Sequence, residues 1–111
     1  MKEYPDNYAW LMGEFGKVLE AHQNFGKELR QAGPLDEKTA QLIQLAGAAS
    51  VRAEGAVHSH VKRALKAGAE TAEIYHSIIL LASTIGFPAA AAALSWAREI
   101  VEPLKETPSK D

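Results

Sequence analysis

The sequence predicts an all-α protein, a single domain of five to six helices. Apolar residues recur at helical spacing along most of the 111 residues, and no segment alternates apolar and polar residues as a half-buried strand does. The chain also lacks the Asn-Gly and Asp-Gly pairs that are typical of tight β-hairpins. We therefore expect a core made only by packing helices against one another.

Glycine and proline divide the chain into its expected helices. The first helical region should cover residues 6–31, as one helix or two, because interior glycines such as Gly13 and Gly16 each cost about 1 kcal/mol relative to alanine. Asp36 is a suitable N-cap for the next helix. We expect further helices at residues 37–50, 52–67, 71–85 and 88–101.

The same signals predict how the domain is organised. Residues 1–34 should form an N-terminal helical region, because Gly33-Pro34 interrupts the helical pattern. Residues 35–102 should form the core, and the polar residues 103–111 a flexible tail. Alanine dominates the apolar residues, and small side chains let helices approach closely, which favours an assembly of helices from several subunits.

Charge and composition exclude several classes of function. The net charge is −2, with 12 basic and 14 acidic residues, and no basic run could neutralise a nucleic-acid backbone. No apolar stretch reaches the roughly 18–20 residues that span a bilayer. The N-terminus also lacks a signal-peptide core. We therefore expect a cytoplasmic protein with neither nucleic acid nor membrane as a partner. The chain has no cysteine, which excludes disulfides and thiolate catalysis by its own residues.

A series of short motifs follows in a specific order between Leu35 and Trp96. They are Leu35-Asp36-x-Lys38-Thr39, Leu42-Ile43-x-Leu45-Ala46, the stretch His60-Val61-Lys62-Arg63-Ala64-Leu65-Lys66-Ala67-Gly68-Ala69, Glu73-Ile74 and Gly86-Phe87-Pro88-Ala89-Ala90. Together they resemble the carboxymuconolactone decarboxylase family, which includes the alkylhydroperoxidase D-like proteins. The resemblance implies an all-α fold and a homotrimer or homohexamer.

The redox branch of that family implies a site that this chain has mostly lost. Its glutamate falls on Gln41, the two cysteines of its Cys-x-x-Cys motif fall on Ala53 and Ala56, and its histidine falls on His60. Thiol-dependent peroxide reduction needs a thiolate nucleophile and a resolving thiol. We therefore expect no such activity from this branch of the family, which lacks the Cys-x-x-Cys motif.

The decarboxylase branch implies a different chemistry, without a cofactor, on a small lactone that carries a carboxylate. An acid protonates carbon as CO2 leaves, and a cationic or hydrogen-bonding group holds the carboxylate. The charged residues expected immediately before the family histidine are replaced here by His58 and Ser59. The chain thus departs from the motifs of both branches.

His60 is the main catalytic candidate. At 100° per residue it shares a narrow face of small side chains with Ala53 and Ala56, beside which a small pocket could form. An imidazole in such a place suits a general acid or base. The alternative is a buried histidine that is hydrogen-bonded to a backbone carbonyl.

His58 and Glu54 lie on the opposite side of the same helix and are four residues apart, so they can pair. They could be a carboxylate that orients a catalytic imidazole, half of a metal site, or a surface ion pair. His58 and His60 point in nearly opposite directions and cannot bind one ion from the same helix. A metal would need a further ligand such as His76, or a neighbouring subunit.

Arg52, expected at the start of its helix, could hold a substrate carboxylate together with the helix N-terminus, and Arg63 is a second candidate. His76 and Gln41 are further substrate-binding candidates. For Arg52 the alternative is a solvent-facing side chain, and for His76 it is the edge of the core.

We therefore expect a cofactor-free enzyme of the decarboxylase-like type, with a small carboxylate or lactone as substrate, no metal, and catalysis by His60, His58 and Glu54. One alternative is a family member that has lost catalysis and serves as a small-molecule-binding or assembly module. A second is a metal-dependent enzyme that uses His58, His60 and His76.

Overall fold

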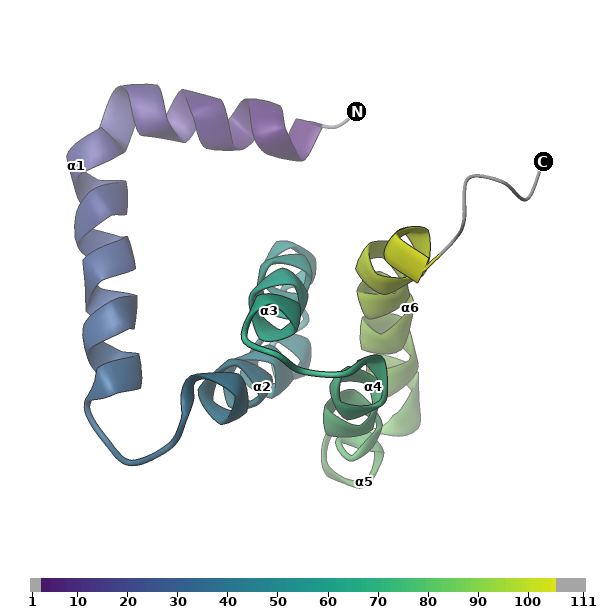
Figure 1. Cartoon of the computed structure of the whole chain (residues 1–111). Coiled ribbons are helices and arrows are strands. Elements are labelled where there is room, and N and C mark those ends of the chain that lie inside the picture. Colours follow the sequence, from purple (N-terminus) through teal and green to yellow (C-terminus); the bar gives the residue numbers. More distant parts are fainter. Residues whose placement is uncertain (1–2, 106–111) are drawn as a thin grey trace. The chain divides into compact units, whose positions relative to one another are not determined.

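The computed structural model describes residues 3–105, and these residues form helices and no strand (Figure 1). In chain order the helices are α1 (Glu3–Gln31), α2 (Glu37–Ser50), α3 (Glu54–Lys66), α4 (Thr71–Ile79), α5 (Ala82–Ile85) and α6 (Phe87–Lys105). The predicted all-α fold is confirmed. None of the described helices is both long enough and apolar enough to cross a membrane.

The chain divides into two compact units between Asp36 and Glu37. The first unit contains α1, which bends at Phe15, where the backbone leaves helical geometry (φ −132°, ψ 41°). Gly13 and Gly16 flank the bend, and the region is two helical arms joined at that point, as the sequence allowed. The Gln23 side-chain amide donates a hydrogen bond to the Tyr8 hydroxyl across the bend, at 3.0 Å.

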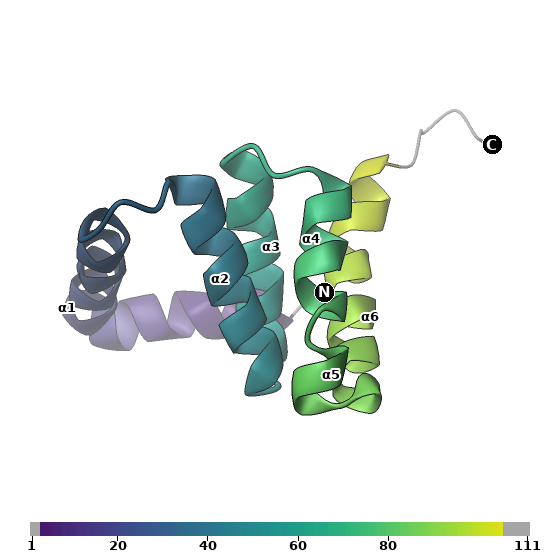
Figure 2. The same ribbon diagram turned by 90° about the horizontal axis from the view of Figure 1, so that it is seen from below.

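The second unit packs α2, α3, α4 and α6 side by side around one core (Figure 2). Its fully buried side chains are mostly small or β-branched, and the contact surfaces of α3 and α6 contain several alanines. Small residues at these positions let the helix axes approach closely, so the core is dense although few of its side chains are large. The core comprises Leu45, Ala48, Ala49, Val57, Val61, Ala64, Ala69, Ile74, Ile78, Ala93, Ala97 and Val101.

Two turns of the same type end α2 and α3. After α2, the Ala53 amide donates to the Ala48 carbonyl and the Arg52 amide donates to the Ala49 carbonyl. This pattern is a Schellman motif, which places the residue after the helix in the left-handed region. Gly68 occupies that position after α3 (φ 100°), whereas Arg52 occupies it after α2 (φ 57°).

The sequence suggested that Arg52 begins α3, but it does not. It lies two residues before Glu54, which is the first residue of the helix, and belongs to the turn that closes α2. Its backbone adopts a conformation that costs an L-residue about 1–2 kcal/mol.

Two other helix boundaries also differ from expectation. The helix expected at 71–85 is interrupted, because the Leu81 amide bonds to Ile78, three residues back, which tightens the turn between α4 and α5. The last helix, expected to end at residue 101, continues to Lys105, so the expected flexible tail is helical over residues 103–105, and its residues 106–111 lie outside the described part of the chain. A proline removes only one helical hydrogen bond, and the buried Val101 anchors the preceding turn in the core.

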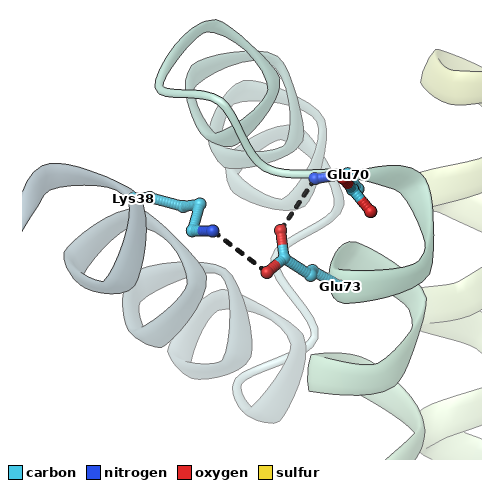
Figure 3. A network of polar contacts seen from close by, with 3 residues as sticks. All are labelled: Lys38, Glu70 and Glu73. Atoms are coloured by element: carbon cyan, nitrogen blue, oxygen red, sulfur yellow. Dashed lines mark hydrogen bonds and ion pairs between the residues drawn. The ribbon is translucent and has the colours of Figure 1, made fainter.

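A polar network joins α2 to the start of α4 (Figure 3). Glu70 and Glu73 form a capping box, in which each side chain accepts a hydrogen bond from the backbone amide of the other. Lys38 on α2 donates to the second oxygen of Glu73, at 3.0 Å. These bonds hold the pKa of Glu73 below its ordinary value of 4.5, chiefly through the Glu70 amide and then through Lys38.

We predict that Arg52→Gly raises the free energy of unfolding by about 0.5–1 kcal/mol, because relief of the left-handed backbone outweighs the extra entropy that glycine loses on folding. Gly68→Ala is the matched control. An added Cβ at Gly68 meets no atom within 4 Å, so its cost should come from the backbone alone and have the opposite sign. Urea unfolding at one protein concentration checks both, and a loss of stability in Arg52→Gly would contradict the assignment.

We predict that the contribution of Glu73 to stability depends on pH. Because its folded-state pKa lies below 4.5, this contribution is present above that pH and is lost as the pH falls through the lowered value. Glu73→Gln should therefore be less stable than the natural protein at pH 7, and the difference should shrink on acidification. Thermal unfolding across pH 2.5–7 measures it, and a difference that does not change with pH would contradict this account.

Candidate functional site

His60 lies on the side of α3 that faces α2. Its Nδ1 atom is 2.9 Å from the side-chain oxygen of Gln41, which lies in the first half of α2. Gln41 is only 1% exposed and is the one buried polar side chain of the core that the structure describes. Two site residues suggested by the sequence are thus brought into direct contact.

Gln41 is held at its other end by Glu37, one helical turn earlier. The Gln41 Nε2 donates to a carboxylate oxygen of Glu37 at 2.9 Å. A carboxylate can only accept, so this bond sets the amide orientation and leaves Oε1 directed at His60. The reversed amide would place its oxygen against the carboxylate and its NH2 group against the imidazole.

This chain of bonds selects the tautomer of His60. An amide oxygen cannot donate, so the proton between Oε1 and the ring must belong to Nδ1. In the neutral ring the lone pair then lies on Nε2. The arrangement Glu37–Gln41–His60 thus makes Nε2 the nitrogen that can take up or release a proton.

A second glutamine lies on the same face of α2. Gln44 follows Gln41 by three residues, and its side-chain oxygen is buried with no hydrogen-bond partner among the described residues. A buried acceptor without a donor costs stability and calls for an explanation, such as a bound water or ligand. Glu37, Gln41 and Gln44 together form a polar stripe on one face of α2, spaced by four and three residues.

The opposite side of α3 carries a separate cluster. His58 Nε2 lies 2.8 Å from a carboxylate oxygen of Glu99 on α6. Glu54, one turn before His58, also contributes a carboxylate oxygen, and the three ligand atoms lie within 4.8 Å of one another. The buried Val57 and Val61 separate this cluster from the side of His60. The expected divergence of His58 and His60 is present.

The other candidates suggested by the sequence belong neither to the Gln41–His60 pair nor to the cluster around His58. Arg52, Arg63 and His76 have exposed side chains. Ala53 and Ala56, where the cysteines of the redox branch fall, are partly buried on the His60 side of α3.

Glu37, Gln44 and Glu99 are site residues that sequence reasoning missed. The first two had a signal, because they share a helical face with Gln41. Glu99 had none, because it is 41 residues from His58 and its partner is set by how α3 packs on α6. The expected Glu54–His58 pair is present as proximity, but the direct bond of His58 is to Glu99.

The family model of the carboxymuconolactone decarboxylase family matches residues 16–99, which is more than half of the chain. The chain belongs to this family. The match includes α2, α3 and nearly all of the core, and therefore both His60 and its partner Gln41. The family resemblance that the motifs carried is confirmed.

One further protein sequence and one solved structure are similar to this chain. An uncharacterized protein of Haemophilus influenzae is 37% identical over 67 residues, which is 57% of this chain and 59% of the relative. The matched region therefore spans less than two thirds of that relative. The crystal structure of a carboxymuconolactone decarboxylase family protein from Legionella pneumophila matches with a TM-score of 0.78 and 21% identity, over 94% of this chain and 92% of the other. At that identity the similarity shows the fold.

We predict different effects on stability for the two glutamines of the α2 stripe. Gln41→Leu removes a buried hydrogen bond from both Glu37 and His60 and should lower the free energy of unfolding by about 1–3 kcal/mol. Gln44→Leu is the matched control, because it removes an oxygen that has no hydrogen-bond partner among the described residues. It should lower the free energy of unfolding by no more than about 0.5 kcal/mol, or raise it. Urea unfolding measures both, and equal losses would contradict the assigned hydrogen bonds.

Proposed function

We propose that the protein is a cofactor-free enzyme in which His60 transfers a proton to or from carbon in a small carboxylate or lactone. The observation that carries this proposal is the hydrogen bond from His60 Nδ1 to Gln41, which leaves Nε2 as the basic nitrogen. Gln41 is buried and held by Glu37, so the ring orientation is set before a substrate arrives. Preorganisation of this kind is what general acid–base catalysis needs.

Gln41 suits both states of the proton cycle. Its oxygen accepts the Nδ1 proton of the neutral ring and of the imidazolium alike, so the bond persists as Nε2 gains and loses its proton. A carboxylate at this position would add a negative charge that favours the imidazolium. The neutral amide of Gln41 orients the ring through a hydrogen bond.

For a decarboxylation, the bond between the carboxylate and carbon breaks, and its electron pair moves into the lactone carbonyl as an enolate. CO2 leaves, and the imidazolium of His60 gives its Nε2 proton to the carbon. The neutral imidazole then takes up a proton from water. His60, Ala53 and Ala56 are all partly buried, and we place the substrate on this side of α3. A substrate hydroxyl or N–H could satisfy the Gln44 oxygen.

Arg52 is our preferred group for the substrate carboxylate. A glycine would remove the backbone cost at this turn, yet the position holds a guanidinium (φ 57°). Arg63 and His76, also exposed, are weaker candidates, because nothing in their local structure sets them apart. We propose no thiol peroxidase activity, because the chain has no cysteine to supply a nucleophile.

We predict that His60→Ala lowers turnover by about 100-fold or more, the usual contribution of a general acid or base. The assay offers a panel of lactone carboxylates and small β-oxo acids in D2O and follows loss of CO2 and entry of deuterium at carbon by NMR. His22→Ala, which removes an exposed histidine from α1, should retain full activity. Turnover that is equal in all three proteins would contradict the role of His60.

The alternative is a small-molecule-binding or assembly module without catalysis. The departure of three of the four positions of the redox branch favours it, since only His60 is retained. Binding of panel compounds without any turnover or exchange, unchanged by His60→Ala, would support this alternative over the enzyme.

We also propose that the protein works as a homo-oligomer, a trimer or a hexamer, as the resemblance implies. Exposed apolar side chains on α1 support this proposal: Trp10, Phe15, Val18 and Phe25 are all at least half exposed in the single chain. Apolar exposure on this scale along one helix is typical of a surface that a partner covers. A second copy of the chain is the partner that we propose.

A further inference from the structure

We propose that Glu54, His58 and Glu99 form a binding site for a divalent transition-metal ion such as Zn²⁺. Each residue offers one ligand atom, an imidazole nitrogen or a carboxylate oxygen, and these atoms all lie within 4.8 Å of one another. The site joins the start of α3 to the second half of α6. It is separate from the His60 side of α3 and does not depend on the function proposed above.

The spacing of the ligand atoms fits a metal ion. Zn²⁺ binds histidine nitrogen and carboxylate oxygen at about 2.0–2.2 Å, which places neighbouring ligand atoms of a tetrahedral site about 3.3 Å apart. His58 and Glu99 already approach to 2.8 Å, and Glu54 lies within reach of both. Small side-chain rotations, with no movement of either helix, would bring all three atoms onto one ion.

The donor set also fits a transition metal. Imidazole suits zinc, copper, iron and nickel, whereas calcium and magnesium prefer sites built only from oxygen. Glu54 and His58 are four residues apart, so both side chains lie on one face of α3, and Glu99 approaches from the neighbouring helix. Three protein ligands leave a coordination position for water.

Charge and burial distinguish this group from an ordinary surface ion pair. The His58 side chain is only 20% exposed, while that of Glu99 is 56% exposed, so the imidazole is anchored and the approach from solvent is open. Two carboxylates converge on one imidazole, which offsets at most one negative charge when protonated and none when neutral. A dication would neutralise both carboxylates and bind the lone pair of the ring.

Bound there, the ion would link α3 to α6 and stabilise the fold of the second unit. It would lie on the opposite side of α3 from His60, because residues 58 and 60 are separated by about 200° around the helix. The three-histidine site suggested by the sequence is not formed within the described part of this chain. His60 and His76 are absent from its one group of three neighbouring ligand residues.

The test is titration of the full-length protein with ZnCl2 at pH 7.5, after purification without a histidine tag and dialysis against EDTA. Isothermal calorimetry should show one Zn²⁺ per chain, and the unfolding temperature should rise with zinc and return with EDTA. Glu99→Gln preserves size and should weaken zinc binding by about tenfold or more, as should His58→Ala.

The matched controls are Glu102→Gln, one turn further along α6, and His76→Ala, an exposed histidine of α4. Both should bind zinc as the natural protein does, and circular dichroism confirms that each variant is folded. If zinc fails to bind, binds with less than one ion per chain, or binds equally to Glu99→Gln and the controls, the proposal is wrong. In that case the cluster is an ion pair bridged by a proton, and the role proposed for His60 is unaffected.

Discussion

The bond between Gln41 and His60 is the interaction on which the functional account depends. It crosses from α2 to α3, joins a fully buried amide to a partly buried imidazole, and is continued by Glu37. In this series of hydrogen bonds each group can act only as donor or only as acceptor. The position of the proton between Gln41 and His60 therefore follows from the positions of the heavy atoms. Gln41, the position on which the glutamate of the redox branch falls by resemblance, is therefore in direct contact with His60.

The side chains of helix α3 face three different surroundings: the core, α2 and α6. Val57, Val61 and Ala64 face the core and are fully buried. His60 turns toward α2, and His58 turns toward α6. Because successive residues are rotated by 100°, a helix of thirteen residues presents His60 and His58 to different neighbouring helices.

Local signals made much of this structure predictable, and long-range packing accounts for what was missed. Interior glycines allowed for two helices in the first region without locating the bend, Gly68 marked the end of α3, and helical periodicity placed His60 and His58 on opposite sides. The contact between Gln41 and His60 could be anticipated only through the family motif. The left-handed turn at Arg52 went unseen because an arginine is a rare residue there, and Glu99 because nothing local links positions so distant in the chain.

The hydrogen bond to Gln41 requires that His60 carry its proton on Nδ1 and its basic lone pair on Nε2. The most direct measurement is a long-range ¹H–¹⁵N NMR correlation spectrum of the histidine side chains, with His60 assigned by comparison with His60→Ala. At a pH where the ring is neutral, the account predicts that the ¹⁵N shift of Nδ1 is that of a protonated nitrogen and the shift of Nε2 that of an unprotonated one. The reverse pattern, with the proton on Nε2, would show that Gln41 does not accept from the ring and would contradict the account.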